Sequence, residues 1–379
     1  MRKTRSKTSN EIYIKPFSEL KASTNTVIVY TNLLFDNKLI FNKIHYNSCT
    51  YKLKKNRIDK KSVEAPYGSI ISVQSKTLIR GLLLKKSKKI WCTICQPYSD
   101  ENSIGGKPKK VFTAKEIYVQ IESEKEDLYE VKYFCTRCDK IYQYSDLKKI
   151  AHFLNQTSVV LILQKDKSEN IPHIHIMIFK DCFKLAGCKS EDAAHEAVRI
   201  LWEDYLSNIN GAYKLKDKND CPKFAFRVSM RNYDFAIGFP IDRVQLNLLM
   251  NSEKYSDKVF LSQYETTNHT AVNVKMFSKK PKDFSYKCLS YSRHDTRDPD
   301  LIELGRRIYF RKKKKKDGKQ TSCITFASSK TIFTGRYLKQ MEENYNFYTK
   351  TIIENRELLE EKNHLREVEE IDIDDYIIE

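Results

Sequence analysis

The sequence predicts an α+β fold built from two copies of one strand-and-helix unit, with an inserted four-cysteine zinc module. Three observations support this prediction. The second half of the chain repeats the order of elements of the first half. Two segments have a single apolar stripe at helical spacing, which indicates helices that pack on a sheet. Two Cys-x-x-Cys pairs lie between strands of the first half.

The first copy is expected over residues 24–82 and 156–210, after a basic arm (1–23) that we expect to be disordered. Its strands are TNTVIVYTNLLF, GSIISVQS, SVVLILQ and HIHIMIF, each rich in β-branched residues. Ser190 can cap the helix that follows, since a serine hydroxyl accepts a backbone N–H bond at this position. One helical stripe joins Ala194, Ala197, Val198, Leu201, Tyr205 and Leu206.

The second copy is expected over residues 223–277 and 308–358. TAVNVKMF corresponds to GSIISVQS, and two strands follow at the spacing of Leu163 to Phe179, which Phe310 and Phe326 repeat. Residues 83–155 and 278–307 then become insertions at equivalent points of the two copies, and residues 359–379 an acidic tail. The last helix carries an apolar stripe over Leu338, Met341, Tyr345, Tyr348 and Ile352, for which a coiled coil is the weaker alternative.

The motifs GFPIDRVQL, SQYETTNHTAVNVKM and ITFASSKTIFTG occur in this order in the second half, and the first half has IMIFKDCFKLAGCKSEDA. Together they resemble the TATA-box-binding protein (TBP) family, over residues 24–80 and 157–355 without the insertions. The resemblance implies a saddle of two pseudo-symmetric repeats, in which a curved antiparallel sheet holds the DNA minor groove and helices cover the convex face. With the insertion, the expected fold is this saddle plus a zinc-ribbon-like module.

The resemblance also implies functional residues and partners. Side chains at the family's four wedge positions would pry base steps apart, and Asn32 would read the groove from its centre. Tyr264 and Glu265 match a segment that binds transcription factor IIB. The implied function is a TBP-like transcription initiation factor that binds and bends A/T-rich promoter DNA and recruits a IIB-like factor and RNA polymerase. The wedge positions are Tyr67, Phe179, His269 and Phe326, of which His269 is smaller and polar.

Four cysteines have the spacing of a structural zinc site, because two tight turns can deliver four thiolates to one tetrahedral Zn²⁺. They are Cys92, Cys95, Cys135 and Cys138. We expect one structural zinc per chain, which would fold an insertion that has few apolar residues. Redox dithiols are the alternative. A second site at Cys288, Cys323 and His294 is not expected, since no Cys-x-x-Cys pair supports it.

Two other functions compete with DNA binding. His173 and His175 resemble the HUH metal motif of rolling-circle replication endonucleases, with Gln164 as a third ligand and Tyr291 or Tyr286 as the nucleophile. The corresponding strand of the second copy has Gln320 and Ser322 instead, so we expect no enzyme. The remaining alternative is a zinc-ribbon protein-interaction module that uses the acidic tail.

The charge of the chain favours a polyanionic partner. Its formal net charge is +19, although residues 354–379 hold eleven Asp/Glu and three Lys/Arg. No run of about 18 apolar residues occurs, so we expect no membrane partner, and a monomer is the starting assumption. We expect residence in the nucleus or, since the Lys/Asn/Ile bias and large insertions suggest a large DNA virus, in a viral cytoplasmic factory or virion.

Overall fold

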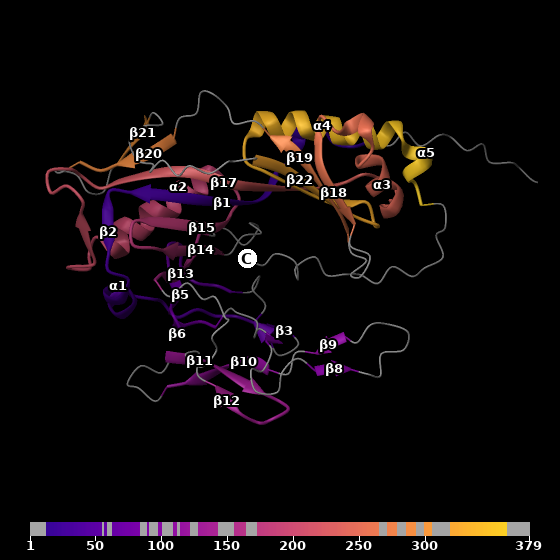
Figure 1. Cartoon of the computed structure of the whole chain (residues 1–379). Helices are drawn as coiled ribbons and strands as arrows, with labels where there is room; N and C mark the ends of the chain where they lie inside the picture. The colour runs from indigo at the N-terminus through magenta and orange to yellow at the C-terminus, as the bar shows by residue number, and fades with distance from the viewer. Residues whose placement is uncertain are drawn as a thin grey trace, which may run out of the picture. The chain divides into compact units, whose positions relative to one another are not determined.

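A computed structural model gives the structure of the protein (Figure 1). The residues form two compact units, and the boundary between the units falls within two long strands, β1 (Ala22–Thr31) and β17 (Lys223–Ala236). Unit 1 comprises Met1–Asn25, Ser229–Phe284 and Lys312–Glu379, and unit 2 comprises Thr26–Val228 and Ser285–Arg311. The structure describes residues 13–54, 57–58, 63–83, 89–90, 98–100, 109–111, 114–121, 128–142, 155–163, 173–264, 271–278, 286–292, 299–304 and 319–361.

Unit 2 contains an antiparallel sheet in which β5 pairs with β13, β13 with β14, β14 with β15, and β15 with β1. The helices α1 and α2 contribute buried side chains to the same core as these strands. This side of the sheet is therefore the helix-covered side. The bounds are β2 (Leu33–Phe35), α1 (Asn37–Lys43), β5 (Ile70–Ser75), β13 (Thr157–Ile162), β14 (His173–Ile178), β15 (Cys182–Cys188) and α2 (Glu191–Ile200).

Side-chain caps begin both helices of unit 2. The Asp36 carboxylate accepts a hydrogen bond from the Leu39 amide at 2.9 Å, and the Ser190 hydroxyl accepts one from the Ala193 amide at 3.0 Å. The predicted Ser190 cap is thus confirmed, because this bond satisfies an amide that has no partner within the helix. After α2, the chain widens into one π-helical segment, η4 (Leu201–Leu206).

Unit 1 contains a second antiparallel sheet, in which β17 pairs with β23, β23 with β22, β22 with β19, and β19 with β18. The long helix α4 covers one side, and its Met341, Tyr345 and Tyr348 are buried in the unit's core. Leu338, which we predicted on the same stripe, is exposed. The bounds are α3 (Arg243–Met250), η5 (Glu253–Tyr255), β18 (Val259–Tyr264), β19 (Ala271–Ser278), β22 (Lys319–Phe326), β23 (Lys330–Gly335), α4 (Leu338–Glu354) and α5 (Arg356–Leu359).

Part of the predicted arm packs on unit 1. Phe17, in the short helix η1 (Phe17–Glu19), lies 5.1 Å from Tyr233 and 5.5 Å from Tyr345 between ring centroids. The Tyr345 hydroxyl donates a hydrogen bond to the Lys15 carbonyl at 2.6 Å. The described residues of the arm are therefore ordered by an aromatic cluster, which a count of basic residues does not reveal.

The order and register of strands recur in the two units. In unit 2 the pairing of β5 with β13 skips Ile71, and in unit 1 the pairing of β18 with β19 skips Phe260. Ile71 lies between the paired residues Ile70 and Ser72, and Phe260 lies between the paired residues Val259 and Leu261. β5 is therefore the counterpart of β18, and β13 is the counterpart of β19. β14 is likewise the counterpart of β22, and β15 of β23.

This register corrects the predicted alignment of the two halves. We matched GSIISVQS with TAVNVKMF, but the sheet matches it with β18, so Tyr67 and His269 do not hold equivalent places. The first long segment enters between the counterparts of β18 and β19, whereas the second enters between β19 and β22. The insertions are therefore not at equivalent points. Alternating strands resemble one another in sequence, and only their pairing partners tell them apart.

The segments predicted as insertions continue the sheet. β6 pairs with β5 and β11, β11 with β10 and β12, β10 with β7, and β20 with β17 and β21. The bounds are β3 (Leu53–Lys54), β4 (Arg57–Ile58), β6 (Leu78–Gly81), β7 (Lys89–Ile90), β8 (Tyr98–Asp100), β9 (Lys109–Val111), β10 (Ala114–Gln120), β11 (Leu128–Cys135), β12 (Ile141–Tyr142), β16 (Tyr213–Leu215), β20 (Tyr286–Ser290) and β21 (Asp300–Leu304).

The predicted fold class, a TBP-like saddle of two repeats with a separate zinc-ribbon-like module, is therefore wrong. Among the described residues, 17 strands are linked by hydrogen bonds into one large antiparallel sheet, and strands of both insertions belong to it. No group of three or more His, Cys, Asp or Glu in the described part of the chain could hold a metal ion. The physical reason is that an unpaired sheet edge offers free N–H and C=O groups, so an inserted strand pairs there.

Candidate nucleic-acid interface

The side of the unit 1 sheet opposite its helices carries two rows of side chains that cross five strands. Residues that pair directly in an antiparallel sheet point to the same side, so the register defines each row. We call this side the open face. One row is Gln263, Asn273, Ile324, Ile332 and Asp234, and the other is Leu261, Lys275, Ser322, Thr334 and Asn232.

Contacts with α4 identify the opposite side as the covered one. The Asn344 amide of α4 donates a hydrogen bond to the Thr321 hydroxyl at 2.9 Å, and the Tyr348 hydroxyl lies 2.6 Å from that of Thr325. Thr321 and Thr325 alternate along β22 with Ser322 and Ile324. Because successive strand residues point to opposite sides, the rows lie on the side that α4 does not cover.

The open face combines amide, hydroxyl and aliphatic groups with little charge. Lys275 and Asp234 are the charged members of the two rows. The Thr334 hydroxyl donates a hydrogen bond to the Asn232 side-chain carbonyl at 3.1 Å, whereas the side-chain carbonyl of Asn273 has no hydrogen-bond partner among the described residues. Such a face can donate hydrogen bonds and pack on flat rings without burying many charges.

Aromatic side chains lie at both ends of the open face. Phe326, a predicted wedge, pairs with Ala271 at one end of β22 and is half-buried. At the other end, Phe260 and Phe277 form an exposed pair with ring centroids 5.6 Å apart. This pair was not predicted from the sequence, although alternation in TAVNVKMF places Asn273, Lys275 and Phe277 on one side. Which side the helices cover was not visible in that alternation.

The two predicted wedges of the first half lie on unit 2. Phe179 follows β14 directly, is half-buried, and its amide donates to the Cys182 carbonyl at 2.9 Å. The Tyr67 hydroxyl donates to the Glu196 carboxylate of α2 at 2.8 Å. Tyr67 therefore reaches toward the helix-covered side of its sheet, unlike Phe326.

Of the predicted partner-binding residues, Tyr264 is described and lies on the helix side of unit 1. Tyr264 pairs with the buried Val272, and the Arg243 guanidinium of α3 lies 5.4 Å from the centroid of its ring. Glu265 and the predicted wedge His269 lie outside the described residues. The structure thus places Tyr264 beside α3 and leaves its neighbour in sequence without a described position.

Asn32, the predicted central base reader, is buried in a hydrogen-bond network of unit 2. Its amide donates to the Asp220 carboxylate at 2.9 Å and to the Cys221 carbonyl at 2.7 Å, and its carbonyl accepts from the Lys223 amide at 2.9 Å. Burial acts to raise the pKa of Asp220, but hydrogen bonds from Lys223, the Cys221 amide and Asn32 outweigh it and lower that pKa. Asn32 thus joins β1 to the start of β17.

Two of the four predicted zinc ligands are described. Cys135 ends β11 and is buried, and Cys138 is exposed, with its sulfur 3.6 Å from the Tyr142 hydroxyl. Cys92 and Cys95 lie outside the described residues. β7 and β11 pair with the two opposite edges of β10, so Ile90 and Cys135 are both backbone pairing partners of Ala114. This register brings the strand that precedes Cys92 to within one strand of Cys135.

The histidines and the tyrosines of the nuclease alternative differ in their surroundings. His173 and His175 lie on the side of β14 opposite the helix core, with ring centroids 5.2 Å apart. Tyr286 and Tyr291 are both buried, and the Tyr291 hydroxyl donates to the Glu203 carboxylate at 3.0 Å. Burial raises the pKa of Tyr291, and so does the adjacent Glu203 carboxylate. Both tyrosines are therefore poorly placed to attack a phosphodiester.

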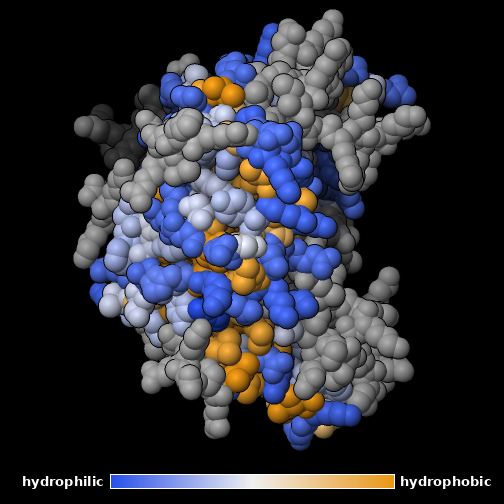
Figure 2. Space-filling view, turned by 90° about the vertical axis from the view of Figure 1, so that its left-hand side faces the viewer, coloured by the Kyte–Doolittle hydropathy of each residue, from blue (hydrophilic) through white to orange (hydrophobic). Residues whose placement is uncertain are grey.

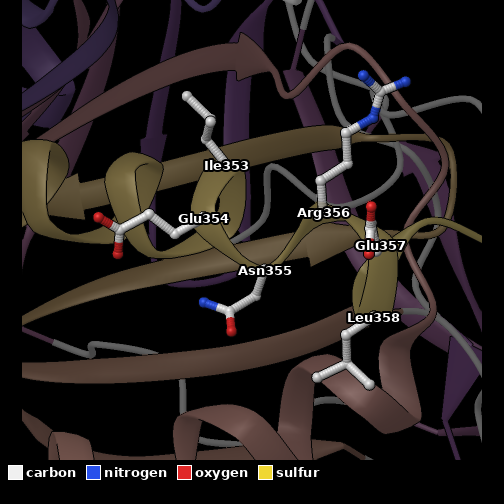
Figure 3. A pocket seen from close by; sticks show the side chains of 6 residues that line it. All are labelled: Ile353, Glu354, Asn355, Arg356, Glu357 and Leu358. Carbon is white, nitrogen blue, oxygen red and sulfur yellow. The ribbon is translucent and has the colours of Figure 1, made fainter.

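In Figure 2, hydrophilic and hydrophobic residues alternate in small patches over the side of the protein where β2 and α1 lie. A pocket of about 470 Å³ at the junction of α4 and α5 is lined by Ile353 to Leu358, whose side chains diverge rather than converge (Figure 3). Among the helices that the structure describes, none combines the length and apolarity that a membrane span requires.

Comparisons with known proteins find similarity among solved structures. No protein-family model matches the sequence, and no curated protein matches it. Among solved structures, the chain is similar to the TBP of Methanococcus jannaschii over 52% of this chain and 78% of that chain, with 12% sequence identity and a TM-score of 0.29. At this TM-score, the similarity by itself assigns neither a fold nor a function.

Proposed function

We propose that this chain is a non-enzymatic DNA-binding protein whose unit 1 contacts the minor groove of duplex DNA through its open face. The observation that carries the proposal is the pair of side-chain rows that cross five strands and that no described helix covers. The minor groove of A·T pairs presents acceptors, which amide and hydroxyl groups can meet as donors. The net charge of +19 supports a polyanionic partner.

The proposed biological role is that of a transcription initiation factor, as the sequence resemblance implies. In this role the protein binds and bends A/T-rich promoter DNA and recruits a IIB-like factor and RNA polymerase, in the nucleus or in a viral factory. Tyr264 is the described residue proposed to contact the IIB-like factor. Tyr264→Ala should reduce capture of that factor on promoter DNA, and unchanged capture would remove Tyr264 from the interface.

The nuclease alternative has weaker support than DNA binding without cleavage. A tyrosine nucleophile must reach the scissile phosphate, and Tyr291 donates its hydrogen bond to a carboxylate inside unit 2 instead. His173 and His175 need no metal to be explained, since they lie on the same side of β14 as Met177. The zinc-ribbon interaction module has no described contact in its favour.

A negative charge introduced on the open face tests the proposal. Ile324→Glu places a carboxylate at the centre of one row, where it would face phosphates and base acceptors, so we expect at least a tenfold loss of affinity for an A/T-rich duplex in fluorescence anisotropy. Leu248→Glu is the matched control, since Leu248 is exposed on α3. Equal affinity for both variants, with unchanged thermal melting, would show that DNA does not contact this face.

A further inference from the structure

The bulge of each sheet marks one end of the side opposite the helices, and the two units differ there in composition. The register matches four positions: Ile71 with Phe260, Ser72 with Leu261, Val160 with Lys275, and Ile162 with Phe277. We call these positions the bulge end of each unit. Equivalent backbone positions therefore carry different side chains.

In unit 2 the bulge end is covered by the chain itself. Val63, with 2% of its surface exposed, forms a buried cluster with Ile71, Val160 and Ile162, which are 0%, 6% and 2% exposed. Cys49 and Ala65 pack against the same cluster. We call Cys49, Thr50, Val63, Glu64 and Ala65 the cover.

Backbone hydrogen bonds hold the cover together. The Thr50 amide donates to the Glu64 carbonyl at 3.0 Å, and the Glu64 amide donates to the Thr50 carbonyl at 2.8 Å. The Asn47 amide donates to the Ile70 carbonyl at 2.7 Å, which ties the start of the cover to β5. Lifting the cover would break these bonds and expose four buried aliphatic side chains to water.

In unit 1 the equivalent positions have no such cover among the described residues. Residues 251–258 connect α3 to β18, whereas residues 44–69 connect α1 to β5. Phe260, Leu261 and Phe277 are 53%, 38% and 47% exposed. Exposed phenylalanines side by side on a sheet favour contact with flat or apolar groups of a partner.

We propose that duplex DNA contacts the bulge end of unit 1 and that the cover excludes DNA from the bulge end of unit 2. This inference rests on the proposed function and specifies how that function is carried out. Phe260 and Phe277 would pack on sugar and base-edge surface of the minor groove, and Lys275, two residues before Phe277 on the same side of β19, would meet a phosphate. The bulge ends of the two units then differ in whether they contact DNA.

Hydroxyl-radical footprinting of the intact protein, read by mass spectrometry, tests this inference with an A/T-rich duplex as the probe. We expect the duplex to suppress oxidation of Phe260, Leu261 and Phe277 at least threefold, while Tyr51, exposed beside the cover, keeps its reactivity. Ile71 and Ile162 should stay unreactive with and without the duplex. Protection of Tyr51, or oxidation of Ile71 upon binding, would overturn the inference.

A second variant makes the test independent of a single readout. Val63→Asp puts a charge in the buried cluster and should release the cover, so that Ile71 and Ile162 react in the free protein and become protected by the duplex; Tyr51→Ala is the control. If Val63→Asp exposes these residues and the duplex does not protect them, the inference fails. If the duplex binds neither variant nor the unchanged protein, the proposed function fails instead.

Discussion

His195 of α2 is a buried imidazole whose surroundings disfavour its protonated form. Its ring lies 4.4 Å from that of Phe226 between centroids, and its Nε2 atom has no hydrogen-bond partner among the described residues. Burial lowers the pKa of His195, and the Lys287 ammonium lowers it further, while Asp192 and Glu191 raise it by less. The neutral ring is therefore part of the core of unit 2.

We predict that unit 2 loses stability as the pH falls below about 6.5, the ordinary pKa of histidine. The folded pKa is lower than the unfolded one, so between these values the unfolded chain binds more protons and acid favours unfolding. Urea unfolding followed by Trp202 fluorescence in a Trp91→Phe background should show this loss between pH 7.5 and 5.5.

The control for this prediction removes the imidazole of His195. His195→Leu should flatten the pH dependence. A slope that His195→Leu does not alter would assign the pH dependence to other groups.

At the scale of elements, the sequence predicted local structure well but did not predict which strands pair with one another. The helix from Glu191, its Ser190 cap and the strands HIHIMIF and CITF could be predicted because each depends on residues close in the chain. The position of the strand GSIISVQS in the sheet could not be predicted. Several strands have a similar alternation of residues, and which of them pair depends on residues far apart in the chain. The exposed Phe260 and Phe277 were missed for the same reason.

The register of β7, β10 and β11 bears on the zinc prediction, which stays a prediction. Ile90 and Cys135 both pair with Ala114, so their backbones lie two strands apart, roughly 10 Å. Cys92 follows Ile90 by two residues in the sequence and lies outside the described residues. The described cysteines alone do not make a metal site.

We predict one zinc per chain in protein purified under reducing conditions, measured by atomic emission. The variant Cys135→Ser with Cys138→Ser should lose the metal, because two remaining thiolates bind zinc much more weakly than four. Cys182→Ser is the control, since that cysteine lies on β15. Purified chain without zinc would contradict the structural assignment.

At the scale of the whole molecule, charge is distributed unevenly along the chain. The formal net charge is +19 even though residues 354–379 carry eleven acidic and three basic residues. A protein that neutralises phosphates releases counterions, so its affinity for duplex DNA falls steeply with salt. The open face itself holds few charges. The phosphate contacts that position the duplex are therefore expected from other residues than the contacts that read the groove.

We predict that affinity for an A/T-rich duplex falls at least tenfold between 50 and 200 mM salt, with fluorescence anisotropy as the measurement.

Phe326→Ala should reduce bending of the duplex more than it reduces affinity, because a lost wedge leaves phosphate contacts in place. Bending is measured by energy transfer between labels at the two duplex ends. Salt-independent binding, or full bending by Phe326→Ala, would contradict this view of the complex.

The sequence by itself determined the helix from Glu191 with its Ser190 cap, the last long helix, the alternating strands, the basic character of the chain and the motifs that suggest DNA binding. These depend on periodicity, composition and neighbouring residues. Only the tertiary structure decided that inserted strands extend the sheet, that Tyr67 bonds to Glu196 of α2, and that a cover closes the bulge end of unit 2 but not of unit 1. Strand pairing and burial join residues far apart in the chain, and no local pattern encodes which partners they find.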